Sequence, residues 1–124
     1  MILSVLAFVV TEVGRHVVRP YVRSSGINDC GLTDSIGNLG GILVQIFFSH
    51  SILNPDRIQS YRLAAFFAIG YVVYEFVQPL LPRGTFDWND VVGTALGYCA
   101  AVLIITILWR VFPPSETDKK PRHA

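Results

Sequence analysis

The chain has 124 residues, of which 52% are apolar and 15% are charged, and its net charge is +1. A soluble domain of this size usually carries about a quarter charged residues, so the composition favours a membrane protein. The balanced charge, without a stripe of Lys and Arg, excludes the basic surface typical of nucleic-acid-binding proteins. Cys30 and Cys99 lie far apart and lack a CxxC partner, so they predict neither a zinc site nor a disulfide framework.

Four stretches approach the roughly 20 apolar residues that a membrane-spanning helix needs. We predict helices over about residues 2–22, 36–53, 61–81 and 91–112. The first is apolar only over residues 2–10, so it must continue to about Val22, with Arg19 and Arg23 extending to the membrane interface. The fourth is the most apolar, and a Pro-Pro pair ends it.

The predicted fold is therefore all-α, a polytopic membrane protein in which residues 1–114 form a bundle of four transmembrane helices. Residues 115–124 are polar and predicted to be a disordered tail. The side of the membrane that carries the two termini holds more Lys and Arg than the opposite side. By the positive-inside rule, both termini are expected in the cytoplasm, with the two polar loops outside.

An Asp followed by Gly three and seven residues later opens both the second and the fourth helix, at Asp34, Gly37 and Gly41 and at Asp90, Gly93 and Gly97. Upstream, His16 to Pro20 aligns with Glu75 to Pro79, and the similarity predicts two repeated helical hairpins. Glycines four residues apart share a helix face and let helix backbones approach closely in lipid. We therefore predict that these four glycines are helix-packing residues.

The acidic residues at the helix starts have a structural explanation. Asp34 and Asp90 are expected in the first turns of their helices, where the helix dipole stabilises a carboxylate, and Asp87 is expected as an N-cap. That explanation does not extend to Glu75, which lies within the third span. An acid there costs about 2.5–3.5 kcal/mol by insertion scales, so it is expected to face a polar interior and a partner.

Glu12 lies in a similar position in the first helix, with Arg15 and His16 as local partners. If the four helices pack together, these polar residues converge near one end of the bundle. Either they form a self-satisfied network that fixes helix register, or they line a polar pocket, open to the outer face, that binds a headgroup, sugar, peptide or cation. The candidate ligand-binding residues are Glu75, Gln78, Arg83, Asp90, Asp34, Asn38, Glu12, Arg15 and His16.

Residues 71–101 carry a resemblance to a known family. Their pattern of Glu75-x-x-Gln78, Pro82-Arg83, Phe86-Asp87, Asp90 and Gly97 resembles the closing signature of the VanZ-like family of small integral membrane proteins. The sequence departs from that signature at Thr94, where the family usually has asparagine, and it lacks the earlier Asp-Lys and histidine motif. The resemblance covers about a quarter of the chain and implies a bacterial inner-membrane protein, without supplying an enzymatic reaction.

Three classes of function fit these features. We favour a non-enzymatic membrane protein whose pocket binds an envelope lipid or another small ligand, with no cofactor, no metal and no nucleic-acid partner. The first alternative is an accessory or structural subunit of a larger membrane complex, with other membrane subunits as partners. The second is a membrane hydrolase or transferase that uses Glu12, His16 and Glu75 as acid–base groups or metal ligands, although no nucleophile motif accompanies them.

Overall fold

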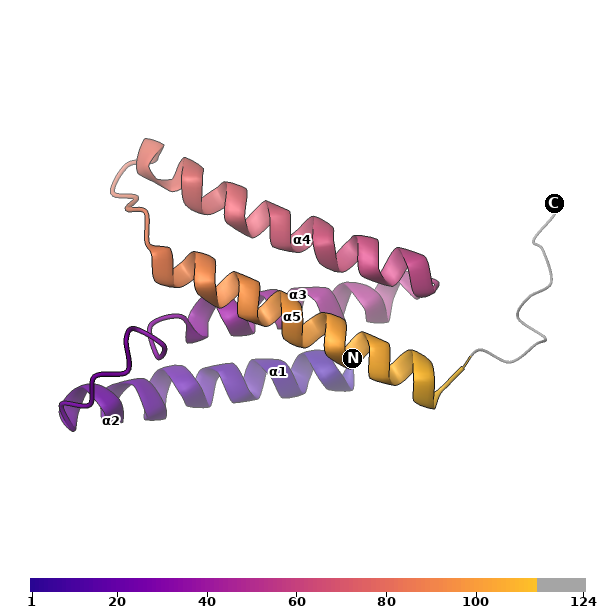
Figure 1. The fold of residues 1–124 in the computed structure, drawn as a ribbon, viewed down its shortest axis with the longest axis horizontal. Helices are drawn as coiled ribbons and strands as arrows, with labels where there is room; N and C mark the ends of the chain where they lie inside the picture. The colour runs from indigo at the N-terminus through magenta and orange to yellow at the C-terminus, as the bar shows by residue number, and fades with distance from the viewer. Residues whose placement is uncertain (114–124) are drawn as a thin grey trace.

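The computed structural model describes residues 1–113. All regular structure within them is helical, as predicted, and four helical stretches run along the length of the molecule (Figure 1). The first stretch consists of α1 (Ile2–Val13), a π-helical segment (Gly14–Val18) and α2 (Arg19–Ser24), and it is followed by α3 (Ile36–Leu53), α4 (Arg57–Val77) and α5 (Trp88–Val111). The tail predicted over residues 115–124, and the last residue of the predicted domain, lie outside the described residues.

Three of these stretches are long and apolar enough to cross a membrane: Ile36–Leu53, Arg57–Leu80 and Trp88–Val111. The second of them includes the 3-10 turn Gln78–Leu80 that follows α4. Large apolar side chains such as Phe66 and Ile69 of α4 are exposed, as is typical of a surface that faces lipid. The fold is thus that of a helical integral membrane protein.

Capping residues set the starts of the last two helices earlier than hydropathy predicts. α4 begins at Arg57 rather than near residue 61, because Asp56 and Gln59 form a reciprocal capping box with bonds of 2.8 and 3.2 Å. α5 begins at Trp88 rather than near residue 91, because the Asp87 carboxylate accepts a 2.8 Å bond from the Asn89 amide. Asp87 is therefore the N-cap of α5, as predicted.

The first helical stretch continues through a proline. Pro20 has no N–H to donate to the His16 carbonyl, four residues earlier. Just before Pro20 the helix widens into the π-helical turn, in which the Arg19 amide donates to the Gly14 carbonyl, five residues back. Helical structure then resumes as far as Ser24, slightly beyond the predicted end near residue 22.

Helix α3 is the centre of the fold. It contacts α1, α4 and α5, whereas α1 contacts neither α4 nor α5 within residues 1–113. The hydrophobic core lies between α3, α4 and α5 and contains Ile42, Ile46, Phe47, Ala64, Ala101 and Ile105. The first helical stretch therefore lies against one side of α3 and leaves much of its apolar surface exposed.

Glycines determine how closely the helices approach α3. A Cβ on Gly97 of α5 would collide with Ile42 and with the Leu39 carbonyl, and one on Gly93 would lie 2.5 Å from the Ser35 carbonyl oxygen. These two glycines therefore pack α5 against α3, in the role that the sequence predicts for them.

The matching glycines of α3 are placed differently. No atom lies within 4 Å of a Cβ built on Gly37, so the predicted packing role of Gly37 is not met. A Cβ on Gly41 would lie 3.2 Å from the Tyr71 hydroxyl of α4. The close approach to α1 occurs instead at Gly40, where a Cβ would collide with Thr11, because α1 packs on the side of α3 that carries Gly40.

Candidate functional site

A polar cavity of about 480 Å³ lies at the end of the molecule where the first helical stretch ends and α3 and α5 begin. Basic residues from the first stretch line one side, and acidic residues from the start of α5 line the other. The start of α3 forms the part between them. The lining residues are Arg15, Arg19, Arg23, Asp34, Gly37, Asn38, Asp87 and Asp90.

The basic side of the cavity depends on the π-helical turn. Arg15, Arg19 and Arg23 are spaced four residues apart. A step of four residues turns slightly more than once around an α-helix, which has 3.6 residues per turn, and slightly less than once around the wider π-helix. The step from Arg15 to Arg19 crosses the π segment and the step from Arg19 to Arg23 lies in α2, so the two angular differences offset each other. All three arginines therefore line the same cavity.

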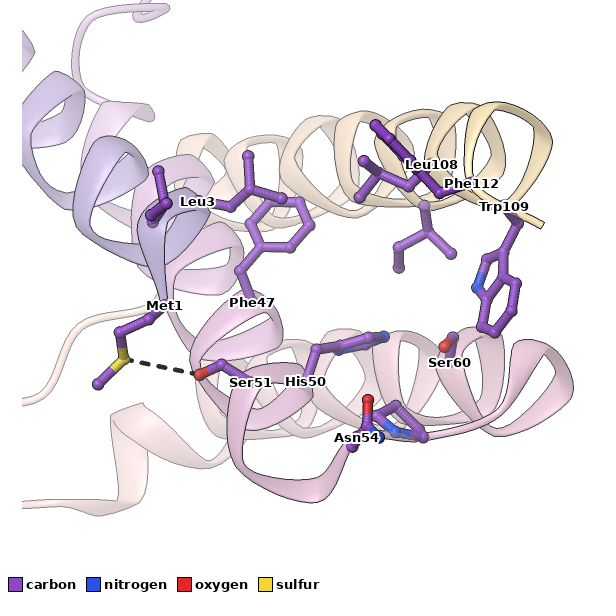
Figure 2. A pocket seen from close by; sticks show the side chains of 13 residues that line it. Met1, Leu3, Phe47, His50, Ser51, Asn54, Ser60, Leu108, Trp109 and Phe112 are labelled. Carbon is purple, nitrogen blue, oxygen red and sulfur yellow. Dashed lines mark hydrogen bonds between the residues drawn. The ribbon is translucent and has the colours of Figure 1, made fainter. Parts of the chain in front are cut away.

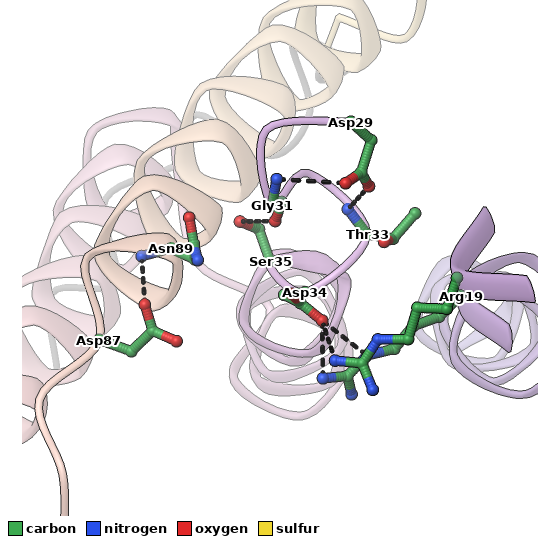
Figure 3. A network of polar contacts seen from close by, with 9 residues as sticks. Arg19, Asp29, Gly31, Thr33, Asp34, Ser35, Asp87 and Asn89 are labelled. Carbon is green, nitrogen blue, oxygen red and sulfur yellow. Dashed lines mark hydrogen bonds and ion pairs between the residues drawn. The ribbon is translucent and has the colours of Figure 1, made fainter. Parts of the chain in front are cut away.

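Asp34 joins the first helical stretch to the start of α3 (Figure 3). Its Oδ1 atom accepts hydrogen bonds of 2.8 Å from Arg19 Nε and from Arg23 Nη2, and Arg19 Nη2 forms an ion pair with it at 2.7 Å. The sequence predicts Asp34 in the first turn of its helix, but α3 begins at Ile36 and Asp34 precedes it in a turn. Its carboxylate is therefore held by two arginines rather than by the helix dipole.

The turn that presents Asp34 is held by another acid, Asp29. Its carboxylate accepts bonds from the Thr33 amide at 2.7 Å and the Gly31 amide at 3.2 Å (Figure 3). Hydrogen bonds from Thr33, above all, lower the pKa of Asp29 below its usual value. Gly31 has a φ of +80° and lies so close to Asn89 of α5 that a Cβ would be 2.7 Å from the Asn89 Oδ1 atom. The turn is thus fixed against the start of α5.

Glu75 is buried outside the lining of this cavity, with only 3% of its surface exposed. Asn38 Nδ2 of α3 donates to Glu75 Oε1 at 3.1 Å. In the amide orientation that gives both Gln78 side-chain atoms complementary partners, its nitrogen donates to Glu75 Oε2 at 2.8 Å and to the Thr85 carbonyl at 2.9 Å. Glu75 has no ion-pair partner within residues 1–113, so amides satisfy its carboxylate. Because Asn38 also lines the cavity, it connects this buried acid to the site.

The structure brings together only some of the predicted ligand-binding residues. Arg15, Asp34, Asn38 and Asp90 line the cavity, whereas Glu75 and Gln78 do not. Glu75 instead lines a separate cavity of about 490 Å³, which it shares with Asn38.

Glu12 and His16 are not part of this cavity. Glu12 accepts a bond from Arg15 at 3.4 Å, and its Oε2 atom lies 3.1 Å from His16 Nε2, so both predicted local partners lie beside it. Glu12 also lines a neighbouring cavity of about 600 Å³ between α1, α3 and α4. The His16 side chain is 74% exposed. Arg83 is also exposed, in a loop where its φ is +65°, and it forms no ion pair with residues 1–113.

Four lining residues were not among the predicted ligand-binding residues: Arg19, Arg23, Gly37 and Asp87. From the sequence, Arg19 and Arg23 were expected only at the membrane interface, Asp87 only as a helix cap and Gly37 only in helix packing. The four-residue spacing of the arginines was the available signal, since residues so spaced share a helix face. Asp87 gave no separate signal, because capping alone explains an acid at that position.

No group of three or more His, Cys, Asp or Glu side chains within residues 1–113 is arranged to hold a metal ion. The chain matches no model of a known protein family, no characterised protein and no solved structure. The class of protein defined by the fold is thus a helical integral membrane protein, and its charged cavity is the feature from which a function can be argued.

Proposed function

We propose that this chain is a non-enzymatic, VanZ-like integral membrane protein whose charged cavity binds the headgroup of an envelope lipid. The observation that carries the proposal is the opposition of basic and acidic side chains across about 480 Å³ of space. This volume falls within the range of about 300–1,000 Å³ that is usual for small-ligand sites.

Each side of the cavity has charge left to offer a ligand. Arg19 and Arg23 share a single carboxylate oxygen of Asp34, so two positive charges face one negative charge there. On the other side, the Asp90 carboxylate has no hydrogen-bond partner within residues 1–113. Guanidinium groups bind phosphate oxygens through paired N–H donors, and free carboxylates accept bonds from an ammonium group.

A phosphoethanolamine headgroup carries both of the charges that this cavity complements. Its phosphate suits Arg19 and Arg23, and its primary ammonium, with three N–H donors, suits Asp87 and Asp90. A phosphocholine headgroup has the same charges but no N–H donor, and a phosphoglycerol headgroup has no cation. We therefore expect phosphatidylethanolamine to bind better than phosphatidylcholine or phosphatidylglycerol.

We further propose four membrane spans, with both termini in the cytoplasm, the cavity at the outer face and the bacterial inner membrane as location. The first helical stretch, from Ile2 to Ser24, is about 34 Å long at 1.5 Å per residue, which matches a hydrocarbon core of about 30 Å. The start of α1 and the end of α5 lie at the same end of the molecule (Figure 1). The cavity lies at the other end, at the depth where headgroups occur.

Native mass spectrometry of the protein released from nanodiscs tests the proposal. With equal amounts of the three lipids, we expect phosphatidylethanolamine adducts to predominate. Asp90→Asn should lower the preference over phosphatidylglycerol about tenfold, as expected for losing one charge-assisted hydrogen bond. Arg19→Gln combined with Arg23→Gln should reduce retention of all three lipids.

Arg83→Gln provides the matched control, because it makes the same change near the same end of the molecule but outside the cavity. It should leave lipid retention unchanged. Equal retention of the three lipids by the native chain would contradict the proposal. Stoichiometric partner chains in the spectra would favour the accessory-subunit alternative instead.

A further inference from the structure

Two arginines lie near each other at the end of the molecule where α4 begins and α5 ends, opposite to the charged cavity (Figure 1). The hydroxyl groups of Tyr61 on α4 and Thr106 on α5 lie 2.9 Å apart and join the two helices there. Arg57 lies four residues before Tyr61, and Arg110 lies four residues after Thr106. Because the two helices are antiparallel, each arginine lies one turn beyond the hydroxyl pair, toward the same end. Both charges accordingly act on Tyr61.

This arginine pair, Arg57 and Arg110, has no acid that neutralises it within the described residues. Both side chains are exposed, and neither forms an ion pair within residues 1–113. Asp56 precedes Arg57, but its Oδ1 atom accepts a 2.8 Å bond from the Gln59 amide at the helix start. The helix dipole favours a cation in the last turn of α5, where Arg110 lies, but not in the first turn of α4, where Arg57 lies. The pair therefore favours an anion beside it.

An apolar cavity of about 550 Å³ lies at the same end of the molecule. It is enclosed by the start of α1, the ends of α3 and α5, and the start of α4 (Figure 2). Ser60 and Trp109 line it, and they are the chain neighbours of Tyr61 and Arg110. An anion that also carries a hydrocarbon chain suits this combination of features, so a lipid fits better than a free anion.

We infer that the arginine pair binds the phosphate monoester headgroup of phosphatidate, one of whose acyl chains lies in the apolar cavity. Guanidinium groups bind phosphate oxygens through paired N–H donors. A phosphate monoester has up to two negative charges and three terminal oxygens, enough for two arginines that converge on one place. A phosphodiester headgroup such as phosphoglycerol has one charge and two terminal oxygens. A zwitterionic headgroup would also bring an ammonium group near two cations.

Trp109 provides a local reporter for the test. The chain has two tryptophans, so in a Trp88→Phe variant all indole fluorescence comes from Trp109. Bromine quenches indole fluorescence on contact. The variant is placed in phosphatidylcholine vesicles that contain equal small fractions of phosphatidate and phosphatidylglycerol, with brominated acyl chains on one lipid or the other. The relative quenching gives the preference between the two anionic lipids at this end of the molecule.

We expect a preference for phosphatidate of about tenfold, as one additional charge-assisted hydrogen bond provides. Arg57→Gln and Arg110→Gln should each lower it to near one, because the remaining arginine is satisfied by a phosphodiester. Arg62→Gln is the matched control, since it removes the same charge from α4 at an exposed position one residue after Tyr61, about 100° around the helix. It should change the preference less than twofold.

Three outcomes would overturn the inference. Equal quenching by the two lipids would mean that basic residues at this end attract any anionic lipid. Equal losses from Arg57→Gln and Arg62→Gln would mean that total charge, rather than the arginine pair, sets the preference. Displacement of brominated phosphatidate by soluble glycerol phosphate, at a concentration equal to that of the lipid, would mean that the arginines bind free phosphate. None of these outcomes bears on the charged cavity, because the vesicles contain no ethanolamine lipid and Trp109 lies at the opposite end.

Discussion

The two hairpins of this protein share a spacing of Asp and Gly but use it in different ways. On α5, Gly93 and Gly97 face α3 so closely that neither position has space for a Cβ. On α3, Gly37 occupies the position that matches Gly93, yet it faces the open charged cavity. The difference arises because α3 has neighbours on three sides, and no single glycine strip can serve them all.

The prolines of the two hairpins show a similar divergence. Helical structure passes through Pro20 because the π turn before it absorbs the missing hydrogen bond, and α2 then carries Arg19 and Arg23 to the cavity. At Pro79 the helix instead tightens into a 3-10 turn and ends. Local backbone adjustment therefore decides whether an equivalent proline extends a functional helix or terminates it.

The largest effect on stability is expected from replacing one glycine by alanine in each hairpin. Gly97→Ala should lower the free energy of unfolding by about 1–3 kcal/mol, because the new Cβ meets the Leu39 backbone as well as Ile42. Gly37→Ala has open space and should raise the free energy of unfolding by up to about 1 kcal/mol through better helix propensity. Unfolding of both variants in mixed micelles with increasing dodecyl sulfate measures the difference.

Equal losses from the two substitutions would contradict this contrast. They would mean that Gly37 packs against another helix, as the sequence repeat suggests, and that the cavity beside it is closed in solution.

An intermediate effect is expected at the contact between the hairpins. Asn38→Leu removes one donor from buried Glu75 and should cost about 1–3 kcal/mol of unfolding free energy. Glu75→Leu in the same chain should restore part of that loss, because the unpaired acid is then gone. A double-mutant cycle in the same micelles measures the coupling. Strictly additive losses would argue against a direct bond between Asn38 and Glu75.

Hydropathy and composition sufficed to predict the helical class and the three long apolar helices. They misplaced the starts of α4 and α5, because the capping bonds of Asp56 and Asp87 extend helices into polar segments that hydropathy assigns to loops. The polar cluster was only partly predictable. Asn38 and Glu75 lie far apart in the chain, so no local pattern indicated their contact.

A polar pocket near one end of the bundle was expected from the sequence, but the helices that enclose it could not be predicted. The sequence repeat suggested Gly37 rather than Gly40 as the packing glycine of α3, because it carries no information about which side α1 occupies. This feature arises from helix placement.

The smallest effect is expected in the turn that presents Asp34. Within the described residues, the second hairpin has no counterpart of this turn. Hydrogen bonds lower the pKa of Asp29 in the folded state below 3.8. The contribution of Asp29 to the stability of the turn is therefore present above the pKa of the unfolded state and is lost as the pH falls through the folded pKa. We expect the Thr33 and Gly31 amides, corrected for intrinsic rates, to lose protection from hydrogen exchange over that acidic range. Asp29→Asn should abolish this pH dependence while the capping bond at Asp56 stays intact. Protection that remains constant on acidification would show that contact between Gly31 and Asn89, rather than the Asp29 carboxylate, holds the turn.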